Sequence, residues 1–176
     1  PQYKDTKVCD DWLNNPDSFY QWFIDNLYFY PGELALDKDI LGFGEQNIYS
    51  PQYASLVPVY VNNAFTCDDS KSGLCYCIKE KTRANGEKYY IVPAAAFCFD
   101  EEKSKDYICN SYVEALQAGR SKRANYIRKI VAKERKARFI PERILAAMEK
   151  WANRCELGLI KIWEPSEEVF KQMGVF

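Results

Sequence analysis

The pattern of apolar and polar positions predicts a mixed chain with helices and strands in both halves. Apolar residues recur at helical spacing over residues 18–30, and the dipeptide Pro-Gly follows, so this segment predicts a short amphipathic helix with an aromatic face. Residues 34–41 alternate instead between apolar and polar positions, which is typical of a strand. Two glycines then allow a turn, after which residues 47–49 can return as the second strand. Residues 58–65 can form a helix behind this ribbon.

The second half of the chain predicts three strands followed by two helices. Asn85-Gly86 is a strong hairpin signal between two segments that are rich in strand formers. The long segment behind them carries apolar residues roughly on one side, and Pro141 can open a further helix. We predict strands over 74–81, 88–99 and 106–110, and helices over 111–138 and 141–151.

These elements predict an α+β fold in two lobes. Residues 1–65 should form the first lobe, and the polar, turn-rich residues 66–73 should form a linker. Residues 74–152 should form a three-stranded antiparallel sheet packed on the long helix, and residues 153–176 a C-terminal tail.

Charge is distributed unevenly along the 176 residues, although the net charge is only −1. Residues 1–65 hold nine acidic and three basic side chains, whereas residues 120–138 hold nine basic and one acidic. Such asymmetry indicates an acidic half joined to a half that attracts phosphate. The alternative is a helix face that is simply solvated.

Cysteine and apolar content restrict the class of protein further. The seven cysteines lack regular spacing, and the chain has no histidine, which favours buried free thiols in a reducing cytosol. A four-cysteine metal site remains the alternative, and its ligands would be Cys67, Cys75, Cys77 and Cys98. No apolar run is long enough to span a membrane and no apolar signal core begins the sequence, so we expect a soluble cytoplasmic chain without a membrane partner.

One acidic segment resembles a known catalytic motif. The run Leu36-Asp37-Lys38-Asp39-Ile40-Leu41 is followed by Tyr49-Ser50-Pro51, by Val57-Pro58 and by Asn62 before Phe65. This order resembles the ββα-metal, or HNH-type, endonuclease motif, and more narrowly a phage-encoded HNH-like family. The resemblance implies a strand–strand–helix lobe and metal-dependent hydrolysis of phosphodiester bonds in DNA.

The spacing of this segment suggests how it would hold a cation. On a strand, Asp37 and Asp39 would project to one face, with Asn62 within coordinating reach of one of them. Such oxygen ligands suit one Mg²⁺ or Mn²⁺ ion. The resemblance implies catalytic roles for Asp37, Lys38 and Asp39, and Lys38 stands where the family has its base. The alternative is a structural salt-bridge cluster.

The second lobe resembles the ethylene-response-type (APETALA-like) DNA-binding fold, in which three strands precede a helix. Gly73-Leu74, the hairpin and the helix that starts near Tyr112 carry this resemblance. It implies that hairpin side chains read base edges while the basic helix contacts phosphates. The candidates are Lys79, Lys81, Arg83 and Lys88 on the hairpin and Arg120, Lys122, Arg123, Arg128 and Lys129 on the helix. Replacing Arg120, Lys122 and Arg123 should leave the lobe folded if they lie off the apolar face.

The sequence therefore predicts a phage protein of the host cytoplasm that binds double-stranded DNA and resembles an HNH homing-type endonuclease. Because the chain has no histidine, a catalytically inactive relative is the alternative. Such a relative would inhibit a host defence or nucleic-acid-processing protein, or serve in virion assembly.

Overall fold

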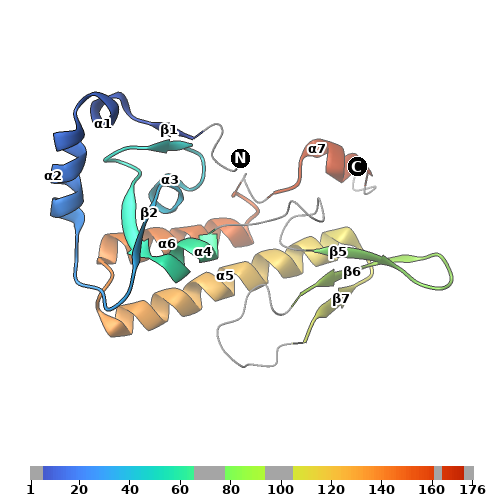
Figure 1. Ribbon diagram of the computed structural model, residues 1–176. Helices are drawn as coiled ribbons and strands as arrows, with labels where there is room; N and C mark the ends of the chain where they lie inside the picture. Colours follow the sequence, from blue (N-terminus) through green and yellow to red (C-terminus); the bar gives the residue numbers. More distant parts are fainter. Residues whose placement is uncertain (1–5, 66–77, 94–104, 161–163, 173–176) are drawn as a thin grey trace. The chain divides into compact units, whose positions relative to one another are not determined.

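The computed structural model describes residues 6–65, 78–93, 105–160 and 164–172, apart from the side chain of Phe170, and it has the predicted α+β composition (Figure 1). The chain divides into two compact units. Unit 1 comprises Pro1–Thr66 and Ile130–Trp151, and unit 2 comprises Cys67–Lys129 and Ala152–Phe176. The predicted second lobe thus contributes residues 130–151 to unit 1, and the predicted linker lies outside the described residues.

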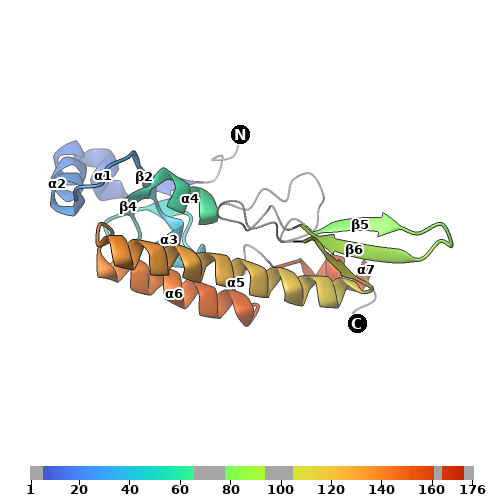
Figure 2. The ribbon, with the colours of Figure 1, turned by 90° about the horizontal axis from the view of Figure 1, so that it is seen from below.

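Unit 1 is built mainly from short elements. They are β1 (Lys7–Val8), α1 (Asp10–Asn14), α2 (Pro16–Asn26), β2 (Leu34–Asp37), α3 (Asp39–Gly42), β3 (Ile48–Tyr49), β4 (Ser55–Pro58) and α4 (Val59–Phe65). The later parts of α5 (Tyr112–Ala137) and the earlier parts of α6 (Glu142–Glu156) complete the unit. In unit 1 these two helices run side by side (Figure 1 and Figure 2). Arg135 of α5 joins them through ion pairs with Glu142 and Glu149 of α6.

The strand pairing in unit 1 differs from the predicted hairpin. β2 pairs antiparallel with β4, which places Asp37 opposite Ser55, whereas β3 pairs in parallel with β1. The prediction that residues 47–49 return beside residues 34–41 was therefore wrong. Every residue of β4 is buried, so this segment offers the larger apolar surface to β2.

Trp151 lies at the centre of the unit 1 core. Its indole is fully buried, and Nε1 donates a 2.8 Å hydrogen bond to the carbonyl oxygen of Ile40. Phe65 meets the indole edge to face at a centroid distance of 5.2 Å, and Phe43 lies at 6.3 Å. The indole thus ties α6 to α3 and α4.

Helix α4 confirms the predicted helix over 58–65 and packs against β2 and β4. Its position is fixed against α5 by Tyr60, whose hydroxyl donates to the buried carboxylate of Glu134. The ammonium of Lys133 lies over the Tyr60 ring at 4.9 Å. A strand–strand–helix arrangement is therefore present, with β4 as its second strand.

Unit 2 contains the predicted three-stranded antiparallel sheet. Strands β5 (Lys79–Thr82), β6 (Lys88–Val92) and β7 (Tyr107–Cys109) lie in that order. The hairpin closes through bonds from the Arg83 amide to the Glu87 carbonyl and from the Gly86 amide to the Arg83 carbonyl. Gly86 has φ +88°, the left-handed conformation that glycine adopts readily in such a loop.

One face of this sheet packs on the long helix. The rings of Tyr90 and Tyr112 lie 5.6 Å apart, and Cys109 and Leu116 are buried beside them. Lys122 reaches from the helix to the carbonyl oxygen of Val92 at 3.3 Å. The opposite face of the sheet therefore projects away from α5. Unit 2 also includes α7 (Glu167–Gln172).

Among the residues whose placement is described, no helix has the length and apolar character that a membrane span requires.

Candidate functional site

Asp37 ends a strand and begins a helical turn. Its Oδ1 accepts hydrogen bonds from the backbone amides of Asp39 at 3.0 Å and Ile40 at 2.8 Å. Such a side-chain contact satisfies the first free amides of a helix and competes with strand pairing. The prediction of one strand over residues 34–41 was therefore wrong beyond Asp37. Asp39 lies in α3, so the two carboxylates do not share a strand face.

The environment of the acidic residues suits a structural role. Asp37 is almost fully buried, and desolvation raises the pKa of its carboxyl to about 7, although the hydrogen bond from the Ile40 amide lowers it. Asp39 accepts a 2.7 Å hydrogen bond from the ammonium of Lys38, and both side chains are largely covered. The charges of Lys38 and Asp39 thus offset each other beside the Asp37 carboxylate, which accepts hydrogen bonds from the first amides of α3.

The side-chain oxygen atoms of these residues are poorly arranged to bind a divalent cation. Magnesium binds ionised oxygen ligands, whereas Asp37 is engaged by two amides and Asp39 by Lys38. Asn62 is half-buried on α4, and no hydrogen bond joins it to either carboxylate within the described part of the chain. Across the same residues, no three His, Cys, Asp or Glu side chains converge as a metal-binding group. Coordination of one cation by Asp37, Asp39 and Asn62 stays a prediction.

Two arginines of the basic helix are engaged within unit 2. Arg120 forms a two-pronged ion pair with Glu164, in which Nε lies 3.1 Å from Oε1. Arg128 pairs with Glu156 in the same way, with Nη1 at 2.9 Å from Oε1, and it also donates to Asn153 at 2.9 Å. Arg128 thus holds the last turn of α6 to α5, and Arg120 holds Glu164, which follows α6, to the same helix. These contacts leave less of their charge for a phosphate.

The remaining candidates on α5 differ in their exposure. Lys122 bonds to Val92 and lies 4.5 Å from the ring centroid of Tyr107. Arg123 is only 5% exposed, so the condition that it lies off the apolar face is not met. Lys129 is exposed. The nine positive charges of residues 120–138 therefore do not form one continuous phosphate-binding stripe.

The hairpin presents its cations differently. Lys79, Lys81 and Arg83 occupy alternate positions along one edge, so they project to the face that points away from α5, and all three are exposed. Lys88 projects to the other face, where it pairs with Glu80 at 2.9 Å. Glu80 is the one acid within the residues of β5, β6 and β7.

The middle strand β6 and the edge strand β7 add aromatic and apolar side chains to this face. Arg83 lies over the ring of Tyr89 at 5.5 Å and donates to Oδ1 of Asn110 at 2.9 Å. Ile108 is opposite Ile91 in the register and is 64% exposed. We define the open face as Lys79, Lys81, Arg83, Tyr89, Ile91, Ile108 and Asn110.

Sequence reasoning missed the contribution of Ile108 and Asn110 to this surface. The alternation over residues 106–110 predicted a strand, but the register of β7 on β6 decides which of its side chains share a face with Lys79. No turn of two or three residues fixes that register, because residues 93–106 separate β6 from β7 in the sequence.

Comparisons with known proteins return no match to this chain among family models, curated proteins or solved structures.

Proposed function

We propose that this chain binds double-stranded DNA through the open face of its three-stranded sheet. The observation that carries the proposal is the placement of Lys79, Lys81 and Arg83 at alternate positions on one exposed face. Phosphate contacts by such cations supply most of the affinity of a protein for DNA, and an arginine can also read a guanine edge in the major groove.

The composition of the open face supports this proposal over a solvated surface. Arg83 is held over Tyr89 and against Asn110, so its guanidinium is oriented before any ligand arrives. Tyr89 and Ile91 are half-buried rather than fully covered, which leaves apolar surface for sugar or thymine methyl contacts. The face is thus cationic at β5 and apolar at β7.

The acidic segment favours binding without cleavage. Asp37 is a cap with its pKa raised to about 7, and Asp39 is paired with Lys38, so neither is arranged as a cation ligand. We therefore propose a DNA-binding protein related to HNH-type endonucleases whose acidic segment has become structural. Its action as an inhibitor of a nucleic-acid-processing protein would be consistent with this proposal.

Replacing Lys79, Lys81 and Arg83 together by alanine should weaken binding to a labelled duplex at least about tenfold at low salt, since each lost phosphate contact removes favourable counterion release. The slope of log affinity against log salt should also become shallower by about 2 to 3. Fluorescence anisotropy between roughly 50 and 200 mM salt measures both quantities.

A charge-matched variant controls for the loss of net positive charge. Lys7, Lys136 and Lys150 are exposed cations of unit 1 that do not belong to the open face, and their joint replacement by alanine should change the affinity much less. Equal losses in the two triple variants would contradict the proposal. Incubation with plasmid DNA in Mg²⁺ or Mn²⁺ tests cleavage separately. Nicking by the parent chain that is lost in the Asp39→Asn variant would support the endonuclease hypothesis instead.

A further inference from the structure

Helix α2 presents apolar residues on two sides. On one side Phe19 and Trp22 pack against the buried Trp12, with both centroid distances to Trp12 at 4.9 Å. The other side carries Tyr20 and Ile24 at 65% and 46% exposure, and no residue of the helix is fully buried. The helix therefore has a second apolar side that the described residues of unit 1 leave exposed.

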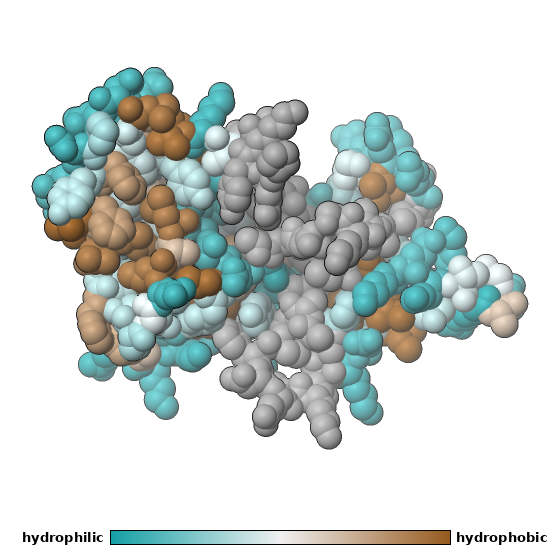
Figure 3. All heavy atoms as spheres, viewed as in Figure 1, coloured by the Kyte–Doolittle hydropathy of each residue, from teal (hydrophilic) through white to brown (hydrophobic). Residues whose placement is uncertain are grey.

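This second side continues beyond the helix. Tyr20, Ile24 and Leu27 follow the i, i+4, i+7 spacing of one helical face, and Leu27 is 50% exposed. Leu13, in α1, is also largely exposed. Figure 3 shows brown, hydrophobic atoms gathered over the part of the surface that α1, α2 and the adjoining strands form. We define the outer stripe as Leu13, Tyr20, Ile24 and Leu27.

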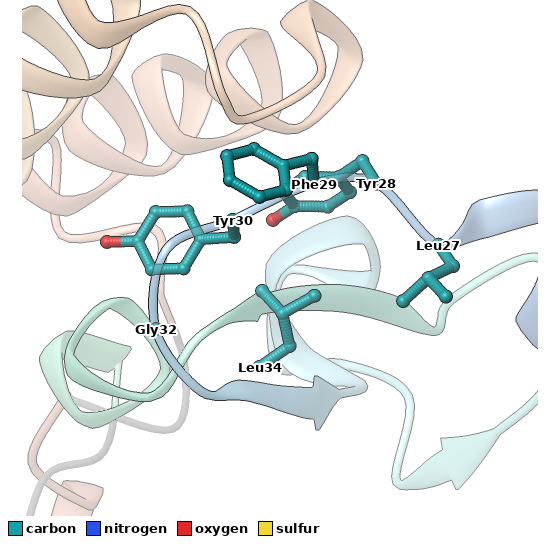
Figure 4. Close-up of a pocket in the computed structure, with 6 residues that line it drawn as sticks. All are labelled: Leu27, Tyr28, Phe29, Tyr30, Gly32 and Leu34. Atoms are coloured by element: carbon teal, nitrogen blue, oxygen red, sulfur yellow. The ribbon is translucent and has the colours of Figure 1, made fainter.

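The outer stripe ends at a cavity of about 540 Å³. Its lining residues are Leu27, Tyr28, Phe29, Tyr30, Gly32 and Leu34, and Figure 4 shows the side chain of Leu34 pointing toward the rings of the loop above it. Tyr28 is fixed there, because its hydroxyl donates to the carbonyl oxygen of Leu56 at 3.0 Å. Phe29 is 78% exposed although its ring meets that of Phe139. The hollow is broadly open to solvent, and its largely apolar lining offers a surface on which a bulky side chain can pack.

The two helices that carry the outer stripe, α1 and α2, bear only negative charge, although Arg143 of α6 donates a hydrogen bond to Asn26 at the end of α2. Residues 8–37 contain no lysine or arginine. The helices α1 and α2 carry four exposed carboxylates, those of Asp10, Asp11, Asp17 and Asp25. An apolar stripe with an acidic border is complementary to an amphipathic helix whose apolar side is bordered by Lys or Arg.

We propose that the outer stripe is a docking surface for a basic amphipathic helix of a partner protein. The apolar side of that helix covers Tyr20 and Ile24, one bulky side chain enters the cavity beside Leu27, and its cations face the aspartates. Nucleic acid and anionic lipid are repelled by the same aspartates. A second copy bound through the same stripe would set aspartate against aspartate, which is destabilising.

The test uses a fluorescently labelled synthetic helix of leucine and lysine, with the leucines on one side, and the full chain. The Tyr20→Ser, Ile24→Ser double variant should bind it at least tenfold more weakly than the parent chain. Asp17→Asn with Asp25→Asn should weaken binding and reduce its dependence on salt. The double variant Leu157→Ser, Leu159→Ser, which changes exposed leucines of unit 2, should bind like the parent.

Three outcomes would overturn the proposal. The first is equal binding by the parent and the Tyr20→Ser, Ile24→Ser variant, with both shown to be folded by circular dichroism. The second is equal binding of a leucine–glutamate helix with the same apolar side. The third is a dimer of the parent chain in light scattering that the double variant abolishes, because the stripe would then serve self-association. DNA binding by the open face should be unchanged in the double variant, so failure of one proposal is distinguishable from failure of the other.

Discussion

Replacement of Trp151 by alanine is expected to lower the free energy of unfolding by about 3–5 kcal/mol, the range for large-to-small changes at a buried aromatic residue. The change removes a fully buried indole and its contacts with Phe43 and Phe65. It also leaves the carbonyl oxygen of Ile40 without its 2.8 Å hydrogen bond. Urea denaturation followed by circular dichroism at 222 nm measures the loss.

Two further variants separate the contributions. Trp151→Phe retains much of the apolar volume but loses the Nε1 donor, so we expect a smaller loss of about 1–3 kcal/mol from the unsatisfied carbonyl. Leu157→Ala changes an exposed residue and should cost less than about 0.5 kcal/mol. A loss below 1 kcal/mol for Trp151→Ala would contradict the central position of the indole in the core.

Stability should fall as the pH rises from about 4 to above 7, because of Asp37. Burial raises the pKa of its carboxyl from 3.8 to about 7, so between these values the folded state binds more protons than the unfolded state. The stabilisation is complete below pH 4 and is lost as the pH passes through 7. A pKa change of this size corresponds to about 4 kcal/mol.

Asp37→Asn isolates this contribution. The amide oxygen can still accept from the backbone amides of Asp39 and Ile40, but the side chain does not titrate. The free energy of unfolding of the variant should therefore depend less on pH between 5 and 8 than that of the parent chain. Leu157→Ala, which changes an exposed residue without a titratable group, should leave the dependence unchanged. Parallel pH profiles for the parent and Asp37→Asn would show that the buried carboxyl is ionised throughout.

The elements with the strongest patterns were predictable from the sequence. The helices over 111–138 and 141–151 correspond to α5 and α6, and the hairpin at Asn85-Gly86 joins β5 to β6. Their signals are local, since periodicity, capping and turn residues act within a few positions. The confirmed α+β class follows from these elements.

The acidic segment was harder to interpret because its conformation depends on a competition between contacts. Alternation over residues 34–41 favours a strand, but the bonds from Asp39 and Ile40 to Asp37 begin a helix at the same place. The pairing of β3 was also not predictable, because its partner is a two-residue parallel strand about forty positions earlier. Pairing at that distance is set by the tertiary fold.

The number of cations on the basic helix does not show which of them are engaged in ion pairs within the protein. Residues 120–138 carry nine cations, yet the partners of Arg120 and Arg128 are Glu164 and Glu156, far along the chain. Periodicity placed the apolar residues of this helix roughly on one side, but it did not indicate that Arg123 is buried. Ion pairs between distant segments therefore decide which charges reach a ligand.

The discontinuity of unit 1 constrains the order of events during synthesis. Domains generally fold as units while the chain emerges from the ribosome, beginning at the N-terminus. Residues 1–66 include most of unit 1, but Trp151 and the Glu134 that anchors Tyr60 are made much later. The core of unit 1 therefore stays incomplete, with the apolar surfaces of Ile40 and Phe65 uncovered, until α6 has been translated. All of the described strands of unit 2 emerge during that interval.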